Sequence, residues 1–304
     1  MRLDYRHRLL HALAASEESA LTPDDLRHDR LLIVRERDLT AVGLHGSAIL
    51  LAETLADNPS TRIQLCGRLA VELAGSELTP KLPGGQARVL FTYLTVSRAL
   101  PSRREELIEA LWPWRAPAGA DTALSALLSR LRSVLGSEVL CGRGEIHLEL
   151  PHDSWIDLEA AEEAIHRAEA AVAQEDWPRG WGPSLVALFT ARRGFLPGED
   201  LPWAQEHRRR LEEIRVSALE CYAAVALGVG GSELAPGERV ARELVALAPY
   251  RERGHALLME ILTARGNSAE ALRVYEQLRQ RLRDELGATP APELRELQER
   301  LLRR

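Results

Sequence analysis

The sequence is poor in several residue types, and each shortage narrows what the protein can be. Aromatic residues make up only 5% of the chain, and alanine and leucine dominate its 45% of hydrophobic residues. This composition is typical of helix-rich globular proteins and predicts few strands. The sequence also lacks the run of about 18 uncharged apolar residues that a membrane-spanning helix needs, so we expect no membrane span.

Cysteine is scarce as well. Its three copies, Cys66, Cys141 and Cys221, are odd in number and widely spaced. They match neither the paired spacing of a disulfide framework nor the ligand spacing of a zinc site. We interpret them as buried, reduced thiols, which indicates a cytoplasmic protein. Ionisable residues are frequent among residues 1–8, and no uninterrupted apolar segment follows them, so no signal peptide is expected.

The motifs of common catalytic sites are missing too. The sequence contains no His-Glu-x-x-His, no Gly-x-Ser-x-Gly and no closely spaced cysteine pair. The glycine-rich segment 228–232 hints at a phosphate-binding loop, but no Gly-Lys-Ser/Thr follows it, and a turn between helices is the better interpretation. His147 and His152 are interpreted as surface histidines. We therefore expect no enzyme activity, no metal site and no cofactor.

The net charge of −6 is unevenly distributed along the chain. Residues 61–150 hold 11 basic and 9 acidic side chains and so carry +2, whereas residues 1–60 carry −3 and residues 151–304 carry −5. Attraction to the phosphates of nucleic acid depends on a local basic face rather than on the charge of the whole chain. The middle region is therefore the candidate for binding nucleic acid.

These three regions also differ in their apolar patterns. Residues 1–60 are interpreted as an N-terminal extension, helical in parts and of unknown role. Residues 61–150 begin with short antiparallel strands, indicated by alternating apolar residues. Helices over 86–96, 103–112 (capped by Pro101-Ser102) and 121–135 are expected next, then a hairpin over 139–148. Strands, three helices and a hairpin, in this order, indicate a winged helix-turn-helix.

The third helix of this region is the candidate for contacting duplex DNA. Its buried stripe is predicted to consist of five leucines, namely Leu124, Leu127, Leu128, Leu131 and Leu135. Its other flank carries hydroxyl and guanidinium groups, on Thr122, Ser125, Ser129, Arg130, Arg132 and Ser133. Arginine can bridge guanine edges or bind phosphate, and small hydroxyl side chains permit close approach. On charge alone, such a flank is also consistent with an ordinary solvated surface.

Residues 151–304 are expected to be helical, with segments over about 155–174, 184–191, 203–228 and 237–248. A helix hairpin follows: one helix ends at Gly266-Asn267, and the next runs from Ser268 to Leu286 and stops at Gly287. Pro249, Ala271 and Tyr275 stand where the tetratricopeptide repeat has its helix-ending proline, its small contact residue and its packing aromatic. Such repeats stack on their neighbours because none can bury its apolar face alone.

Two stretches of the chain resemble known families. Residues 251–302 resemble the bacterial transcriptional activator domain, the C-terminal half of the SARP family of antibiotic regulatory proteins. Residues 62–150 resemble the DNA-binding domain of OmpR and PhoB in the variant that SARP proteins use. The matching words are Arg88-Val89-Leu90, Ser102 to Trp112, and Leu128-Ser129-Arg130-Leu131-Arg132. The fold this implies is mainly α with small β: a winged helix-turn-helix over 61–150 and a tetratricopeptide-like domain over 151–304.

The resemblance also implies roles for individual residues. Arg130 takes the base-reading position and Arg132 a backbone-contacting one. Arg103 and Arg104 would contact phosphate at the start of the second helix, and Arg143 would lie in the wing. The segment 113–120, with Trp114 and Arg115, corresponds to the loop that meets RNA polymerase in this family, whereas Trp112 is expected to fill the core.

The function implied is that of a cytoplasmic transcription activator that binds promoter repeats on double-stranded DNA, contacts RNA polymerase and forms a homodimer. The sequence departs from the family at Asp121, an acidic residue at the start of the third helix, and at Glu145 in a short wing. Each lost phosphate contact weakens DNA binding and its salt dependence. A second interpretation therefore stays open, in which the chain is a tetratricopeptide-like interaction scaffold with a degenerate winged helix and no effective DNA binding.

Overall fold

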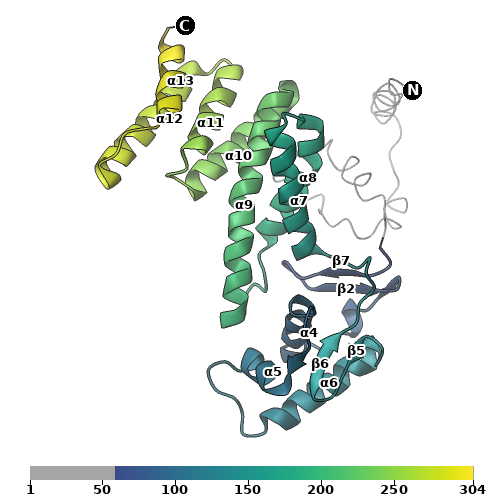
Figure 1. Ribbon diagram of the computed structural model, residues 1–304. Coiled ribbons are helices and arrows are strands. Elements are labelled where there is room, and N and C mark those ends of the chain that lie inside the picture. The colour runs from purple at the N-terminus through teal and green to yellow at the C-terminus, as the bar shows by residue number, and fades with distance from the viewer. Residues whose placement is uncertain (1–58, 304) are drawn as a thin grey trace, which may run out of the picture. The chain divides into compact units, whose positions relative to one another are not determined.

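The computed structural model describes residues 59–303, and these form a mainly helical chain with two small sheets (Figure 1). All of them belong to one compact unit, Glu53–Arg304. The predicted N-terminal extension, residues 1–60, lies outside the described residues except for its last two positions. None of the helices in the described part is long and apolar enough to cross a membrane.

The first sheet has the strand order β3-β2-β1-β7. The predicted short strands are present as β1 Arg62–Gln64, β2 Ala70–Leu73 and β3 Ser76–Glu77. The fourth strand, β7 Trp155–Ile156, was expected to be the start of a helix and is instead paired in parallel with β1. No local pattern indicates this two-residue strand, because its partner comes from far earlier in the chain.

Three helices follow the first strands: α4 Gln86–Val96, α5 Arg104–Leu111 and α6 Ala120–Leu135. They pack on one another around leucines, and all five leucines of the predicted α6 stripe are buried. The predicted cap at Ser102 is wrong. Ser102 lies in strand β4 Ser102–Arg103 opposite Ile146, and α5 is capped by Arg103, whose backbone N–H donates to Glu106 Oε2 at 2.9 Å.

The predicted hairpin is formed by β5 Leu140–Cys141 and β6 Glu145–Leu148, which join β4 in a second sheet of order β4-β6-β5. Its turn requires glycine at position 142. The φ angle there is +85°, and a Cβ atom would lie 1.7 Å from the carbonyl oxygen of Glu145. This element is the wing of a winged helix-turn-helix, and it packs beside α6 (Figure 1).

The remainder of the described chain is helical apart from β7. It comprises α7 Asp157–Ala173, α8 Trp177–Arg193, α9 Pro202–Val229, α10 Leu234–Leu247, α11 Glu252–Ala264, α12 Ser268–Arg281 and α13 Pro292–Leu302. Short helical turns occur at η2 Thr79–Lys81, η3 Gly231–Glu233 and η4 Leu282–Leu286. The helix expected over 268–286 therefore ends in a π-helical turn, and α13 was not predicted.

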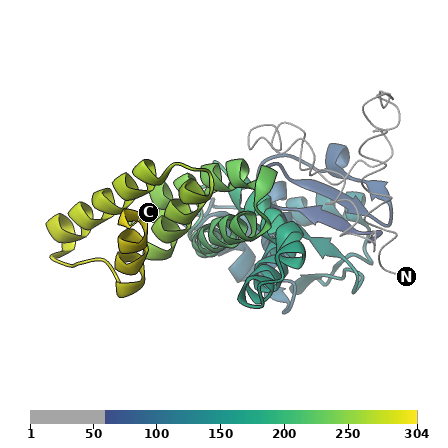
Figure 2. The ribbon, with the colours of Figure 1, turned by 90° about the horizontal axis from the view of Figure 1, so that it is seen from above.

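From α9 onward each helix packs on the next, as Figure 2 shows from above. Small residues permit the close approach of these helices. A Cβ atom on Gly237 of α10 would lie 2.6 Å from Ala226 Cβ of α9, closer than packed atoms can come. Ala271 and Tyr275 of α12 are buried, as the tetratricopeptide pattern predicts. Cys66 and Cys221 are buried free thiols, whereas Cys141 is only half-buried.

Asp157 joins the first sheet to the helices. Its carboxylate is fully buried and accepts hydrogen bonds from the backbone N–H groups of Leu65, at 2.8 Å, and Cys66, at 3.0 Å. Arg193 of α8 also lies 3.4 Å from this carboxylate. Burial raises the pKa of Asp157, while the two N–H donors and the guanidinium oppose that rise.

We expect Asp157→Asn to lower the free energy of unfolding by about 2–4 kcal/mol, because the amide offers one acceptor oxygen to the two backbone N–H groups and removes the negative charge beside Arg193. Urea denaturation followed by circular dichroism measures this. Asp153→Asn is the matched control, since Asp153 is exposed, and it should change stability by less than about 0.5 kcal/mol. Equal stability of the two variants would contradict the role assigned to Asp157.

Candidate nucleic-acid interface

Helix α6 presents a polar flank opposite its buried leucines. Thr122, Ser125, Ser129 and Arg130 are all exposed on it. This follows from the helical repeat, because leucines three and four positions apart occupy one face and leave the intervening positions on the other. The predicted buried stripe of α6 is therefore confirmed, and the role of its exposed flank stays a prediction.

Arg130 is the predicted base-reading residue, and its guanidinium is available. Within the described part of the chain, its one hydrogen bond is from Nε to the carbonyl oxygen of Ala126 in the same helix, at 3.4 Å. This bond is long, and no residue between positions 59 and 303 forms an ion pair with the side chain. The planar guanidinium can therefore turn toward a base edge or a phosphate at little cost.

Arg104 differs, because α6 itself occupies its guanidinium. Nη2 of Arg104 lies 2.7 Å from Asp121 Oδ1, and Nε donates to the same oxygen at 2.8 Å. Nη2 also donates to the Ser125 hydroxyl at 2.7 Å. The acidic residue that departs from the family pattern thus forms an ion pair with one of the predicted phosphate contacts. It does not cap α6, since Gly119 holds the cap position.

Arg132 is half-buried and holds the wing. Its Nε donates to the carbonyl oxygen of Leu140 at 3.1 Å, and Nη2 donates to that of Gly142 at the hairpin turn. The side chain predicted to contact the DNA backbone therefore connects α6 to β5 and its turn. Arg143, the next residue along the wing, is exposed. Arg103 is exposed at the start of α5, close to the wing strand β6.

The loop between α5 and α6 is open to solvent. Trp114 is 76% exposed, an unusual position for a tryptophan, and Arg115 beside it is exposed as well. Trp112 is half-buried rather than filling the core as expected. An exposed indole next to a guanidinium is a combination enriched at the centres of protein interfaces.

Trp203, on α9, contacts helices α4 and α5 of the winged helix. No sequence pattern indicated this contact. Its Nε1 donates to the carbonyl oxygen of Ala110 in α5 at 3.1 Å, and its ring packs edge-on against Tyr93 with 5.1 Å between centroids. Arg98, just after α4, and Glu159 of α7 form a two-bond ion pair nearby. The helices behind α6 are therefore fixed to α7 and α9.

Other candidates for chemistry do not form sites. The glycine-rich segment 228–232 is the turn from α9 into η3, with Gly230 at φ +71°, as expected. His147 lies 3.4 Å from Glu149 on the wing and forms no cluster. No group of three or more histidine, cysteine or acidic side chains among residues 59–303 could hold a metal ion.

Comparison with known proteins identifies relatives of this chain. The family described as the bacterial transcriptional activator domain matches residues 156–302. The regulatory protein AfsR of Streptomyces griseus is 37% identical over 236 residues, which cover 75% of this chain but 23% of that protein. The transcriptional regulator RedD of Streptomyces coelicolor is 29% identical over 234 residues, covering 69% of this chain and 62% of RedD.

A solved structure has the same fold. It is that of Mycobacterium tuberculosis EmbR in complex with a low-affinity phosphopeptide. The two align with a TM-score of 0.66 and 25% sequence identity, covering 81% of this chain and 66% of the EmbR chain. AfsR is described as a regulatory protein, and EmbR and RedD are described as transcriptional regulators. This chain spans only about a quarter of the length of AfsR.

We expect substitution of the two α6 arginines to affect stability to different extents. Arg132→Ala should lower the free energy of unfolding by about 1–3 kcal/mol, because two carbonyl groups of the wing lose a charged donor. Arg130→Ala should change it by less than about 0.5 kcal/mol, because only a weak bond within the helix is lost. Thermal unfolding of the two variants tests this. Equal losses would show that Arg132 does not hold the wing.

Proposed function

Since residues 156–302 belong to the bacterial transcriptional activator domain family, we propose that this SARP-type chain is a transcription activator that binds promoter DNA through α6. The observation that carries the proposal is the exposed guanidinium of Arg130, which forms no ion pair with any residue of the described range 59–303, on a winged helix joined to that domain. A protein that binds bacterial chromosomal DNA works in the cytoplasm, and its action needs no catalytic step.

Helix α6 suits the major groove of duplex DNA. The groove is wide enough for one helix, and arginine recognises guanine through two hydrogen bonds to O6 and N7. Arg130 supplies the guanidinium, while Thr122 and Ser129 are small enough for the helix to approach closely and can bind bases or phosphates. Arg103, at the start of α5, and Arg143, on the wing, are both exposed, which supports the proposal that they contact the adjacent phosphates.

The number of phosphate contacts is small for such a protein. Asp121 already neutralises Arg104, and Arg132 is directed toward the wing. Because each phosphate contact adds to affinity and to its salt dependence, one copy should bind weakly. A homodimer on a direct repeat would combine the binding free energies of two copies, because the second copy binds at a high effective concentration, and this is the binding mode we propose.

Activation further requires contact with RNA polymerase. The exposed Trp114 and Arg115 of the α5–α6 loop support a polymerase-binding role for this loop. Because the loop is continuous with α6, DNA binding by α6 would present Trp114 beside the promoter. The helical domain provides the surface for dimerisation.

Arg104 and Arg132 form hydrogen bonds within the protein, and these bonds favour one alternative function. In this alternative the winged helix has lost effective DNA binding, and the chain is an interaction scaffold whose stacked helices bind other proteins. The two functions differ in one measurable respect, namely whether any duplex is bound in a way that depends on Arg130.

Selection of the full chain against random duplexes tests the proposal. We expect enrichment of direct repeats, and Arg130→Ala should weaken binding to the selected duplex by at least about tenfold, since one bidentate contact to guanine is lost. Arg283→Ala is the matched control, because Arg283 is an exposed arginine in the distal turn η4. No enriched sequence, or equal losses for the two variants in fluorescence anisotropy, would favour the scaffold.

We also expect Asp121→Ala to strengthen binding to any duplex by about three- to tenfold and to steepen its salt dependence, because Arg104 is released and a carboxylate near the phosphates is removed. Anisotropy titrations at several salt concentrations measure both effects. Glu163→Ala serves as control, because Glu163 pairs with Arg167 on α7 at 3.7 Å and its loss releases a distant arginine. Unchanged or lower affinity of the Asp121 variant would contradict this role of the ion pair.

A further inference from the structure

Helices α10, α11 and α12 enclose a groove of about 930 Å³ that the DNA-binding function does not use. We call it the basic groove. It is defined by Arg242, Arg273 and Arg281, by apolar walls at Val245 and Val274, and by His255 and Leu258, both of which are buried.

The charges around the basic groove are not balanced. Arg242 is paired with Glu238 and with Glu270, the latter at 2.6 Å, and Glu270 is the one acidic residue that lines the groove. Arg281 reaches only Glu285, at 3.7 Å. Arg273 has no hydrogen bond or ion pair to any described residue. Of these exposed guanidinium groups, that of Arg273 has no partner among the described residues and that of Arg281 has one distant partner, so both can attract a further carboxylate.

His255 adds a requirement for a hydrogen-bond donor. It is 2% exposed, and its Nε2 lies 3.1 Å from the carbonyl oxygen of Pro249, which can only accept. Burial lowers the pKa of His255, so the ring is neutral near pH 7, Nε2 carries the proton and Nδ1 is an acceptor. Nδ1 is buried and has no partner in the described part of the chain. Backbone N–H groups of a bound segment are donors of the kind it lacks.

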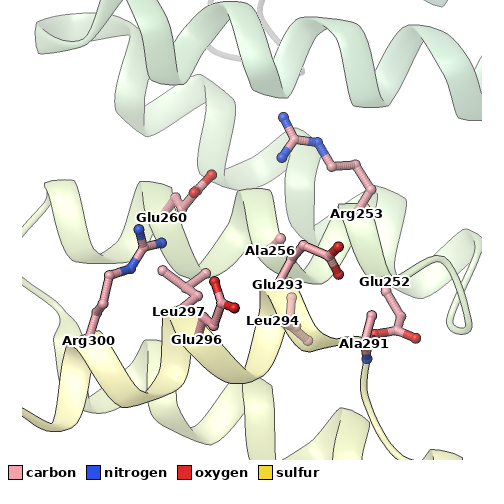
Figure 3. Close-up of a pocket in the computed structure, with 10 residues that line it drawn as sticks. All are labelled: Glu252, Arg253, Ala256, Glu260, Ala291, Glu293, Leu294, Glu296, Leu297 and Arg300. Atoms are coloured by element: carbon pink, nitrogen blue, oxygen red, sulfur yellow. Dashed lines mark hydrogen bonds between the residues drawn. The ribbon is translucent and has the colours of Figure 1, made fainter.

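A second groove has the opposite character. It lies between α11 and α13, has a volume of about 380 Å³ and is shown in Figure 3. We call it the acidic groove. Leu294 and Leu297 lie in it, and its four glutamates outnumber its two arginines; these charged residues are Glu252, Glu260, Glu293, Glu296, Arg253 and Arg300. Of these two grooves in the described part of the chain, the basic groove is therefore the one that fits an acidic ligand.

We propose that the basic groove binds an acidic peptide segment of a partner protein. Its carboxylates would pair with Arg273 and Arg281, its apolar side chains would pack on Val245 and Val274, and its backbone would approach His255. This binding does not depend on DNA, so it holds or fails separately from the function proposed above.

The walls favour a peptide over a nucleic acid or a free anion. Valine and leucine side chains gain from burying apolar atoms, which phosphate and the sugar-phosphate backbone do not offer. The groove also lacks exposed aromatic residues on which bases could stack, among the residues that line it. A peptide with acidic and apolar residues at helical spacing satisfies both kinds of lining.

Fluorescence anisotropy of the full chain with a fluorescein-labelled peptide of glutamate and leucine at helical spacing tests the proposal. We expect saturable binding that weakens with salt, and at least about tenfold weaker binding of the matched peptide with glutamine at every glutamate. The double variant Arg273→Glu/Arg281→Glu should lose at least about tenfold in affinity for the acidic peptide, because two attractions become repulsions.

The control variant is Arg253→Glu/Arg300→Glu, which makes the same change in net charge within the acidic groove. It should retain peptide affinity within about twofold, and Arg273→Gln/Arg281→Gln, a milder change, should give an intermediate loss. Circular dichroism verifies that each variant is folded. Equal loss in the control, equal binding of the glutamine peptide, absence of peptide binding, or a labelled single-stranded DNA that binds in place of the peptide would each overturn the proposal.

Discussion

At the start of α7 a fully buried carboxylate accepts hydrogen bonds from two backbone N–H groups that lie 92 and 91 residues earlier in the chain. Asp157 reaches them because β7, directly before it, pairs in parallel with β1. A buried charge that loses its partners is strongly destabilising. Separation of the first sheet or of Arg193 from the start of α7 would therefore destabilise the fold. Trp203 and the Arg98–Glu159 pair strengthen the same connection. The winged helix is thus anchored to the helical domain by one buried carboxylate and by two further polar contacts nearer the surface.

Three arginines of the winged helix make different kinds of contact. Arg132 holds the wing, Arg104 ties α5 to α6 through Asp121, and Arg130 is left exposed. These contacts stabilise the fold and position α6, but guanidinium groups that bind carbonyls or a carboxylate contribute less to phosphate binding. These internal contacts make the winged helix more rigid, and they would lower the affinity of a single copy for DNA. Specific binding would then depend on Arg130 and on cooperation between copies at repeated sites.

In the helical half, basic and acidic side chains are concentrated in different grooves. The groove over α11 between α10 and α12 has excess arginine, whereas the groove between α11 and α13 has excess glutamate. Helix α11 lines both, so its residues alternate between two electrostatic environments. Stacked helices form such grooves repeatedly. Opposite charges in neighbouring grooves would allow one domain to distinguish partners by their charge.

The sequence by itself determined the local elements. The leucine stripe of α6, the helix at 86–96, the wing hairpin and the burial of Ala271 and Tyr275 all follow from apolar periodicity and glycine placement, which act within a few residues. The exposed flank of α6 followed as well. Tertiary structure alone decided that Trp155–Ile156 is a strand and that Ser102 pairs instead of capping. It also decided that Arg104 and Arg132 bind other elements of the winged helix, whereas the one described bond of the Arg130 side chain is within its own helix. Each of these outcomes depends on partners distant in sequence or on side-chain directions across two elements, and no local pattern encodes either.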